Sequence, residues 1–345
     1  MKLKPTLAAF AAAATLAWLP WSAQAQAANC NRNCLGEMAD QVLASIVARK
    51  PASLPLSTEY AATENNQPAA LPMMTLWNTM TAVKAKYYVI DPVSEQLFLI
   101  ATLAEGAHDV LLFGRLKVQN HQLTEIELYT DRSRANGGFQ FDAAGVAHFP
   151  AAWTVPLKPQ QRASRKVLLQ AGLSIFDTGV DSPPVAEDCL LMENGKVVGE
   201  DPEVLKYVGA PDGKLETRRN PDGTVPIACG VPPFRPTDPL ARTDIIDDES
   251  GVVVSLAMVS GNVEPYVITK PTDSAFVPFA MLQPYEDMLK VQRTSGLYHG
   301  PTLRVMPATL AVAQLHRVFD GKVQGMMMLQ NMAPIGARSP WALAK

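Results

Sequence analysis

Alternating apolar and polar residues between positions 87 and 129 predict three consecutive antiparallel strands. The segment reads YYVIDPVSEQLFLIATLAEGAHDVLLFGRLKVQNHQLTEIELY, with a turn at Asn120-His121 before its last strand. A similar pattern begins at Thr243 as TDIIDDESGVVVSLAMV and resumes, after an insertion, at Thr309 as TLAVAQLHRVFDGKVQGMMML. Two copies of one strand order predict two similar domains.

A segment with an apolar face at helical spacing precedes each copy. Residues 34–50 read CLGEMADQVLASIVARK, and Pro51 ends the run. Residues 160–177 read QQRASRKVLLQAGLSIFD and repeat the pattern. Because each predicted helix is apolar on one face, we expect each to pack on the sheet that follows it.

Pairs of equivalent residues support the duplication and locate its insertions. Glu64-Asn65 aligns with Glu193-Asn194, Asp91 with Asp247, and Val118 with Val318. The spacing between equivalents grows along the chain. We therefore expect two insertions in the second copy. These are placed at about residues 201–240 and 261–302.

Composition shifts divide the chain into segments. Residues 136–157 are rich in glycine at their start and contain prolines further along, which is typical of a linker. The first domain is predicted at residues 28–135 and the second at residues 158–345. The fold class is α+β, with two tandem cone-shaped domains, each a helix packed on a curved antiparallel sheet.

A helix cannot cover every inward side chain of a sheet that curves around it, so a pocket should remain at the open end of each domain. This element order resembles the nuclear-transport-factor-two-like superfamily, which includes ketosteroid isomerase, scytalone dehydratase and polyketide cyclases. The resemblance implies a cone-shaped pocket that takes small molecules.

A series of short motifs also runs through nearly all of the mature chain. They are Cys30-Asn31-Arg32-Asn33-Cys34-Leu35, Leu54-Pro55-Leu56, Ala62-Thr63-Glu64-Asn65, Leu76-Trp77-Asn78-Thr79, Asp91-Pro92, Arg115-Leu116-Lys117-Val118, Ile126-Glu127, Asp188-Cys189, Glu193-Asn194-Gly195 and Trp341. In order and spacing they are similar to a family of secreted fungal and bacterial proteins defined as a domain of unknown function. That resemblance implies tandem cone-shaped domains and disulfides, but no activity.

The chain departs from that family's pattern at two places. Glu64-Asn65-Asn66 stands where Glu-Asn-Gly is usual, and residues 331–334 read NMAP where a His-Arg pair is more frequent. If that pair serves chemistry in the family, this chain lacks it.

Composition and charge narrow the range of partners. Of 345 residues 48% are hydrophobic and 18% charged, which is enough apolar material for two ordinary cores. The formal net charge is −3, and no long run of Lys and Arg occurs. We expect no nucleic-acid partner, because such binders carry a basic surface.

Residues 1–27 have the pattern of a signal peptide, with Lys2 and Lys4, an apolar stretch and a small-residue cleavage site. The mature protein is expected to be periplasmic or secreted. Asn29 before Cys30 does not suit a lipoprotein cleavage box. No later apolar run approaches the ~18 residues of a membrane span.

Four cysteines in an oxidising compartment indicate two disulfides rather than metal ligands. The economical pairing joins Cys30 to Cys34 and Cys189 to Cys229. A redox or zinc site at Cys30-x-x-x-Cys34 is the rival interpretation, but further Cys or His residues at ligand spacing are missing. No metal site is predicted.

His316 is the leading catalytic candidate. Alternation puts it on one face with Leu310, Val312, Gln314 and Val318, and the first copy has Leu116 at its position. A titratable group among apolar neighbours suits a general acid or base, because burial moves its pKa. The alternative is a core histidine bonded to a carbonyl group or water.

Other candidates are a loop pair and a set of pocket residues. Tyr298-His299 lies between two glycines in the second predicted insertion, where it would either close over a pocket or form an exposed tip. Aromatic, amide and methionine side chains suit a mostly apolar ligand pocket, and core packing is the alternative for each. These candidates are Trp77, Tyr87, Tyr88, Gln314, Met326 and Met328.

Charged residues alternate with apolar ones in the first copy. Arg115 and Lys117 fall on the strand face opposite to that of Leu116. We expect them to lie either in solvent or in a contact between the two domains. Cross-strand pairs with Glu125 and Glu127 are expected, each exposed pair worth roughly 0.2–1 kcal/mol.

No nucleophile elbow, phosphate loop, dinucleotide fingerprint or metal-binding helix motif occurs in the sequence. The first hypothesis is therefore an exported protein that binds a small apolar or aromatic molecule. A cofactor-free isomerase, dehydratase or cyclase using acid–base chemistry is the alternative, and a structural interaction protein is the third. A cone-shaped fold is compatible with all three functions.

Overall fold

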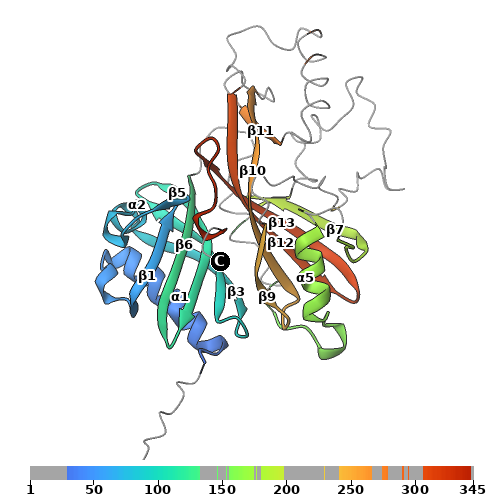
Figure 1. The fold of residues 1–345 in the computed structure, drawn as a ribbon, viewed down its shortest axis with the longest axis horizontal. Helices are drawn as coiled ribbons and strands as arrows, with labels where there is room; N and C mark the ends of the chain where they lie inside the picture. The colour runs from blue at the N-terminus through green and yellow to red at the C-terminus, as the bar shows by residue number, and fades with distance from the viewer. Residues whose placement is uncertain are drawn as a thin grey trace, which may run out of the picture.

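A computed structural model of the protein has a mixed α+β fold with two sheets and few helices (Figure 1). Most strand pairs are antiparallel, in agreement with the predicted fold class at this level. The structure describes residues 29–132, 146, 153, 155–174, 176, 180–197, 229, 241–265, 274–278, 290, 294 and 306–342.

The first half of the protein is a six-stranded sheet with one long helix against it. Its strand order is β2-β1-β6-β5-β4-β3, and β1 pairs with β6 in parallel. The elements are α1 (Arg32–Ala48), β1 (Leu56–Glu64), β2 (Gln67–Pro68), α2 (Thr75–Thr79), β3 (Ala82–Asp91), β4 (Gln96–Glu105), β5 (His108–Gln119) and β6 (Gln122–Arg132), with 3-10 turns at Pro51–Ser53 and Leu71–Met73.

The second half repeats this arrangement with longer central strands. Its sheet has the order β11-β10-β12-β13-β7-β8, and β9 also pairs with β10. The elements are α5 (Arg165–Ser174), β7 (Val185–Glu193), β8 (Lys196–Val197), β9 (Arg242–Asp247), β10 (Val252–Pro265), β11 (Ser274–Pro278), β12 (Met306–Phe319) and β13 (Lys322–Ala333), with 3-10 turns at Pro159–Gln161 and Pro340–Ala342. β11 pairs with the far end of β10, which extends beyond the rest of the second sheet (Figure 1).

Local geometry matches between the two halves at the positions aligned from the sequence. Asn65 and Asn194 both have positive φ, at 51° and 44°. Their amides donate to the carbonyl oxygens of Leu128 and Met328, each at 2.9 Å. β7 pairs with β13 in parallel, as β1 does with β6. Apart from β11, the strand order of the second sheet, with β9 beside β10, therefore matches that of the first.

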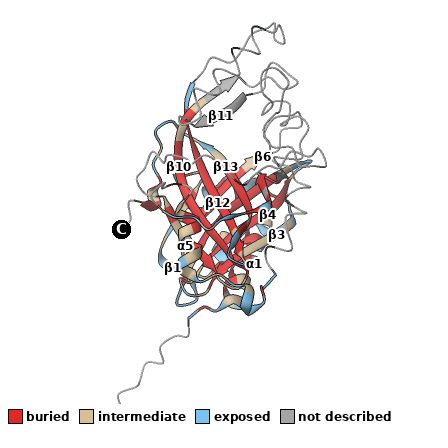
Figure 2. Ribbon diagram, turned by 90° about the vertical axis from the view of Figure 1, so that its right-hand side faces the viewer, coloured by how far each residue is buried: buried red, intermediate tan, exposed pale blue. Residues whose placement is uncertain are grey.

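The two sheets pack face to face, with α1 and α5 on the outer faces (Figures 1 and 2). The cluster between the sheets draws Phe98 and Phe113 from the first and Leu256 and Met327 from the second. No residue of α1 or α5 belongs to it among the described positions. The resulting order of layers is helix, sheet, sheet, helix.

Of the two expectations for the charged face of the first sheet, solvent or an interdomain contact, the structure shows the contact, because Arg242 of the second half binds Glu127. Arg115 pairs with Glu127 and Glu125, and Lys117 with Glu125, as alternation predicts. However, Glu127 is 0% and Arg115 3% exposed, because the second sheet covers them. The estimate for exposed pairs does not apply to Glu127.

Two reciprocal ion pairs join the halves. Arg165 at the start of α5 donates to both oxygens of Asp91, at 3.0 and 2.8 Å. Arg32 at the start of α1 donates to both oxygens of Asp247, at 3.0 and 2.7 Å. Each half thus contributes one arginine and one buried aspartate. Such exchange is typical of the isologous interface of a symmetric dimer.

The C-terminal segment returns to the first half. Trp341 donates its indole N–H to Thr63 Oγ1 at 3.1 Å, and Asn66 donates to the carbonyl oxygen of Arg338 at 2.9 Å. The end of the predicted second domain therefore packs on the first sheet. Most of the predicted linker and of both predicted insertions lies outside the described residues.

Both predicted disulfides are present. Cys30 is bonded to Cys34, with 5.3 Å between their Cα atoms, and Cys189 to Cys229, with 5.7 Å. These bonds fit an oxidising, extracellular or secretory environment. Among the described helices, none has the length and apolar character needed to cross a membrane.

Candidate functional site

Polar side chains form a row across the helix-facing side of the second sheet. Ser255 on β10 lies opposite Gln314 on β12, which lies opposite Met328 on β13. Met328 in turn lies opposite Glu193 on β7. Directly opposed residues in neighbouring strands project from the same face. We call Glu193, Ser255 and Gln314, together with His316 two residues further along β12, the polar row.

The helix α5 covers this face. Ser255 donates its hydroxyl to the carbonyl oxygen of Gly172 on α5 at 2.9 Å. A Cβ at Gly172 would lie 2.7 Å from Ser255 Oγ, so glycine is needed for this close approach. His316 lies opposite Val253 and Met326, which belong to the apolar cluster under α5. Ser255, Gln314 and His316 are therefore buried between helix and sheet.

Gln314 and His316 are buried, and three of their polar atoms have no hydrogen-bond partner among the described residues. Gln314 is 0% exposed, and neither its Nε2 nor its Oε1 has a partner among the described residues. His316 is 1% exposed, and its Nδ1 has none there either. A buried polar group left unpaired costs about 1–3 kcal/mol. Such groups call for an explanation, and a bound molecule is one.

Burial shifts the pKa values of the two titratable members of the polar row so far that the carboxyl group of Glu193 binds a proton more tightly than the imidazole of His316. Burial lowers the pKa of His316 from 6.5 to about 4, so its imidazole is neutral at pH 7. Burial raises the pKa of Glu193 from 4.5 to about 7, so both forms of its carboxyl group are populated there. The row can therefore offer neutral donors and acceptors and a carboxyl group that exchanges a proton near neutral pH.

The first half provides an internal comparison, because strand register identifies the equivalent of each residue. Each of these residues across the second sheet has an equivalent in the first. The pairs are Ser255 and Leu99, Gln314 and Gly114, Met328 and Leu128, Glu193 and Glu64, and His316 and Leu116. Leu99, Leu116 and Leu128 belong to one continuous apolar core under α1. The fold itself therefore does not need polar groups at the positions of Ser255, Gln314 and His316.

The apolar core of the second half is divided where the first is continuous. One cluster contains Leu168, Val253 and Val318, and the other contains Val312 and Met328. Gln314 lies on β12 between Val312 and Val318, so the polar row separates the clusters. A molecule held there would contact apolar side chains on two sides and polar atoms in the middle.

Glu64 and Glu193 show how one position serves two environments. Glu64 accepts hydrogen bonds from the amides of Thr75 at 2.7 Å and Leu76 at 2.9 Å, and thereby caps α2. Glu193 makes no such bond to the described residues. In the sequence, Glu193 is apparent only as the equivalent of Glu64 in the repeat. That equivalence to a capping glutamate is the signal that could have identified it.

The remaining predicted site residues are distributed over both halves. Trp77 is 2% exposed and donates to Ser45 Oγ on α1 at 3.1 Å, so it lies in the first core. Tyr87 packs toward the cluster between the sheets, and Tyr88 toward α1. Met326 and Met328 lie on the same face as the polar row. Tyr298 and His299 fall outside the described residues.

A molecule that is apolar over most of its surface and carries hydrogen-bonding groups would match the chemistry of these side chains. Two methionines, Met326 and Met328, add a deformable apolar wall beside Gln314 and His316.

No protein-family model matches this chain, and no curated protein matches its sequence. The geometry of the polar row therefore carries the functional argument.

Proposed function

We propose that this is an exported protein that binds a small, largely apolar molecule on the helix-facing side of the second sheet. The observation that carries the proposal is Gln314, a fully buried amide whose Nε2 and Oε1 both lack partners among the described residues. A ligand with a hydrogen-bond acceptor and a donor would satisfy both atoms. The oxidising environment that suits the two disulfides agrees with export.

The chemistry of the polar row favours ketones, phenols and sterols as ligand classes. Their rings match the apolar clusters, and a carbonyl or hydroxyl group matches Gln314 and neutral His316. Glu193 lies two strands away from Gln314, roughly 10 Å at the usual strand spacing. A molecule of two or more fused rings would reach both.

The binding proposal is tested by a thermal-shift panel of ketones, phenols and sterols. We expect at least one compound to stabilise the parent protein, by about 2.7 kcal/mol at a concentration 100 times its Kd. Gln314→Met should lose this stabilisation, because methionine keeps the length of the side chain and removes the amide. Gln119→Met, at an exposed position on β5, is the matched control. If every compound that stabilises the parent protects Gln314→Met equally, the proposed site is wrong.

We expect the same variant to be more stable than the parent when no ligand is present. Gln314→Met should raise the free energy of unfolding by about 1–2 kcal/mol, because two buried unpaired atoms are removed. Guanidinium unfolding at equilibrium measures this change. Gln119→Met should stay within about 0.5 kcal/mol of the parent. A loss of stability in Gln314→Met would mean that its amide is bonded within the protein.

A specific observation favours a second candidate, a cofactor-free isomerase, dehydratase or cyclase. Glu193, with a pKa raised to about 7 by burial, shares a face with neutral His316. A carboxyl group of this kind can take and return a proton, while the imidazole positions a substrate carbonyl group. Glu193→Gln should then abolish turnover of a panel compound and retain its binding. Binding without turnover in the parent would exclude this candidate for the compounds tested.

A further inference from the structure

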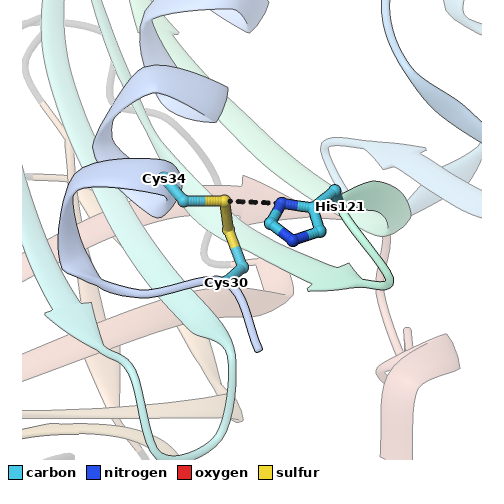
Figure 3. Close-up of side chains that lie close together, drawn as sticks. All are labelled: Cys30, Cys34 and His121. Atoms are coloured by element: carbon cyan, nitrogen blue, oxygen red, sulfur yellow. Dashed lines mark hydrogen bonds between the residues drawn. A yellow bond between two sulfur atoms is a disulfide. The ribbon is translucent and has the colours of Figure 1, made fainter. Parts of the chain in front are cut away.

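His121 lies against the disulfide between Cys30 and Cys34 (Figure 3). Its Nδ1 is 3.3 Å from Cys34 Sγ, and the two sulfurs and a ring nitrogen of His121 lie within 4.8 Å of one another. Cys30 is buried, Cys34 is partly exposed and His121 is exposed. In the sequence no third ligand lies near Cys30 and Cys34, which is why no metal site is predicted there. The fold supplies that ligand.

Three separate local structures position the group. Cys34 lies in the first turn of α1, where its amide donates to the N-cap side chain of Asn31 at 3.1 Å. Cys30 is held by an amide hydrogen bond of 2.7 Å to Glu95 Oε1. His121 occupies the two-residue turn between β5 and β6. The backbone on both sides is therefore fixed before any ligand binds.

The second half has the same local structures without the three side chains. The amide of Val167 donates to Ser164 Oγ at 3.4 Å, as that of Cys34 does to Asn31, so Val167 and Ala163 replace the two cysteines. The turn between β12 and β13 is Asp320-Gly321, so Gly321 replaces His121. The fold forms with all three residues absent, so their joint presence in the first half has another cause.

The backbone conformation of His121 also indicates that this residue has a function beyond forming the turn. Asn120 and His121 both have positive φ, at 51° and 58°, in a turn for which glycine is the usual second residue. Gly321, at 72°, is that usual choice. A side chain kept in a conformation that favours glycine is typical of functional positions.

We propose that reduction of this disulfide creates a site for a late transition-metal ion such as Zn²⁺, with Cys30 Sγ, Cys34 Sγ and His121 Nδ1 as ligands. Two thiolates and an imidazole are a donor set that Zn²⁺ binds tightly. A sulfur and a nitrogen on one tetrahedral zinc ion lie roughly 3.6 Å apart. The observed distance between Cys34 Sγ and His121 Nδ1 is 3.3 Å, so little movement of the histidine is required.

The chemical steps balance with a dithiol as reductant. The dithiol gives two electrons and two protons to the sulfur–sulfur bond and becomes a cyclic disulfide, leaving Cys30 and Cys34 as thiols. Metal binding then releases the two thiol protons. The imidazole binds through the lone pair of Nδ1 and keeps its proton on Nε2. The fourth position on the ion stays open to water or an external ligand.

The test measures Zn²⁺ affinity by competition with a chromophoric chelator, using the full mature chain reduced by a dithiol and desalted without oxygen. The reduced parent should bind one ion tightly, and the oxidised parent none. His121→Gly should weaken binding by more than about tenfold, the loss found even for outer-shell partners of metal ligands. His108→Ala removes an exposed histidine from the other end of β5 and should leave the affinity unchanged.

Two further variants separate this site from the second cysteine pair. Cys189→Ser/Cys229→Ser should retain the tight site, and Cys30→Ser/Cys34→Ser should lose it. Equal affinity in Cys30→Ser/Cys34→Ser or in His121→Gly would overturn the proposal. The melting temperature of oxidised His121→Gly should equal or exceed that of the parent, because Gly321 shows that this turn accepts glycine. A lost metal site then cannot be attributed to unfolding.

Discussion

Replacing Glu127 with alanine is expected to destabilise the protein by about 3–5 kcal/mol, because two buried guanidinium groups lose their shared carboxylate. Arg115 Nε lies 3.0 Å from Glu127 Oε2, and Arg242 Nη2 lies 2.8 and 3.0 Å from its two oxygens. Arg115 belongs to the first sheet and Arg242 to the second. The loss should appear as a lower guanidinium midpoint with an unchanged slope.

Neighbouring side chains increase the dependence on this carboxylate. Tyr129 donates its hydroxyl to Glu127 Oε1 at 2.8 Å. Burial, together with the Glu127 charge, raises the pKa of Tyr129 well above its usual value, so the phenol remains a donor. The guanidinium carbon of Arg115 lies 5.0 Å from the ring centre of Trp341. Glu127 therefore supports contacts of both sheets and of the C-terminal segment.

An exposed pair on the same sheet is the matched control. Arg132 Nε lies 2.6 Å from Glu105 Oε2, with both side chains in contact with solvent. Glu105→Ala should cost less than about 1 kcal/mol. The triple variant Glu127→Leu/Arg115→Met/Arg242→Met should recover most of the stability lost in Glu127→Ala, because no unpaired charge remains. If Glu127→Ala costs no more than Glu105→Ala, water reaches the cluster and the sheets are not packed tightly there.

The pairing of Arg115 with Glu127 could be predicted from alternation, but the choice between solvent and an interdomain contact was left open, because the pattern of one strand does not say what covers each face. One signal was present in β4. Its residues 97–104 are all buried, and the segment LFLIATLA is apolar apart from Thr102. A strand without a polar face is typical of a sheet covered on both sides. That reading would have placed the second sheet against the first.

The candidate site was only partly predictable for a similar reason. Alternation within β12 puts Gln314 and His316 on one face. Glu193 joins them through the parallel pairing of β7 with β13, which has an irregular register between Val323 and Gly325. Cys34 and His121 meet only when the start of α1 packs beside a distant turn. Contacts of this kind depend on tertiary structure and leave no periodic signal in the sequence.

Glu193→Gln and His316→Leu are expected to change the pH dependence of stability in opposite directions. The pKa of Glu193 is raised from 4.5 to about 7 in the folded state, so its contribution is full below pH 4.5 and is lost as the pH rises through 7. The pKa of His316 is lowered from 6.5 to about 4, so its contribution is full above pH 6.5 and is lost as the pH falls through 4. Between pH 4.5 and 6.5 the two trends oppose each other in the parent.

The difference in free energy of unfolding between each variant and the parent should change with pH in opposite senses. Glu193→Gln should gain relative stability as the pH rises from 4.5 to 7, and His316→Leu should lose it as the pH rises from 4 to 6.5. Each change should approach about 3 kcal/mol, since a tenfold change in proton affinity corresponds to about 1.4 kcal/mol. Guanidinium unfolding at half-unit pH steps measures both, with His108→Leu as the exposed-histidine control. Parallel curves for parent and variants would mean that neither group is desolvated, and the polar row would then be open to water rather than enclosed for an apolar ligand.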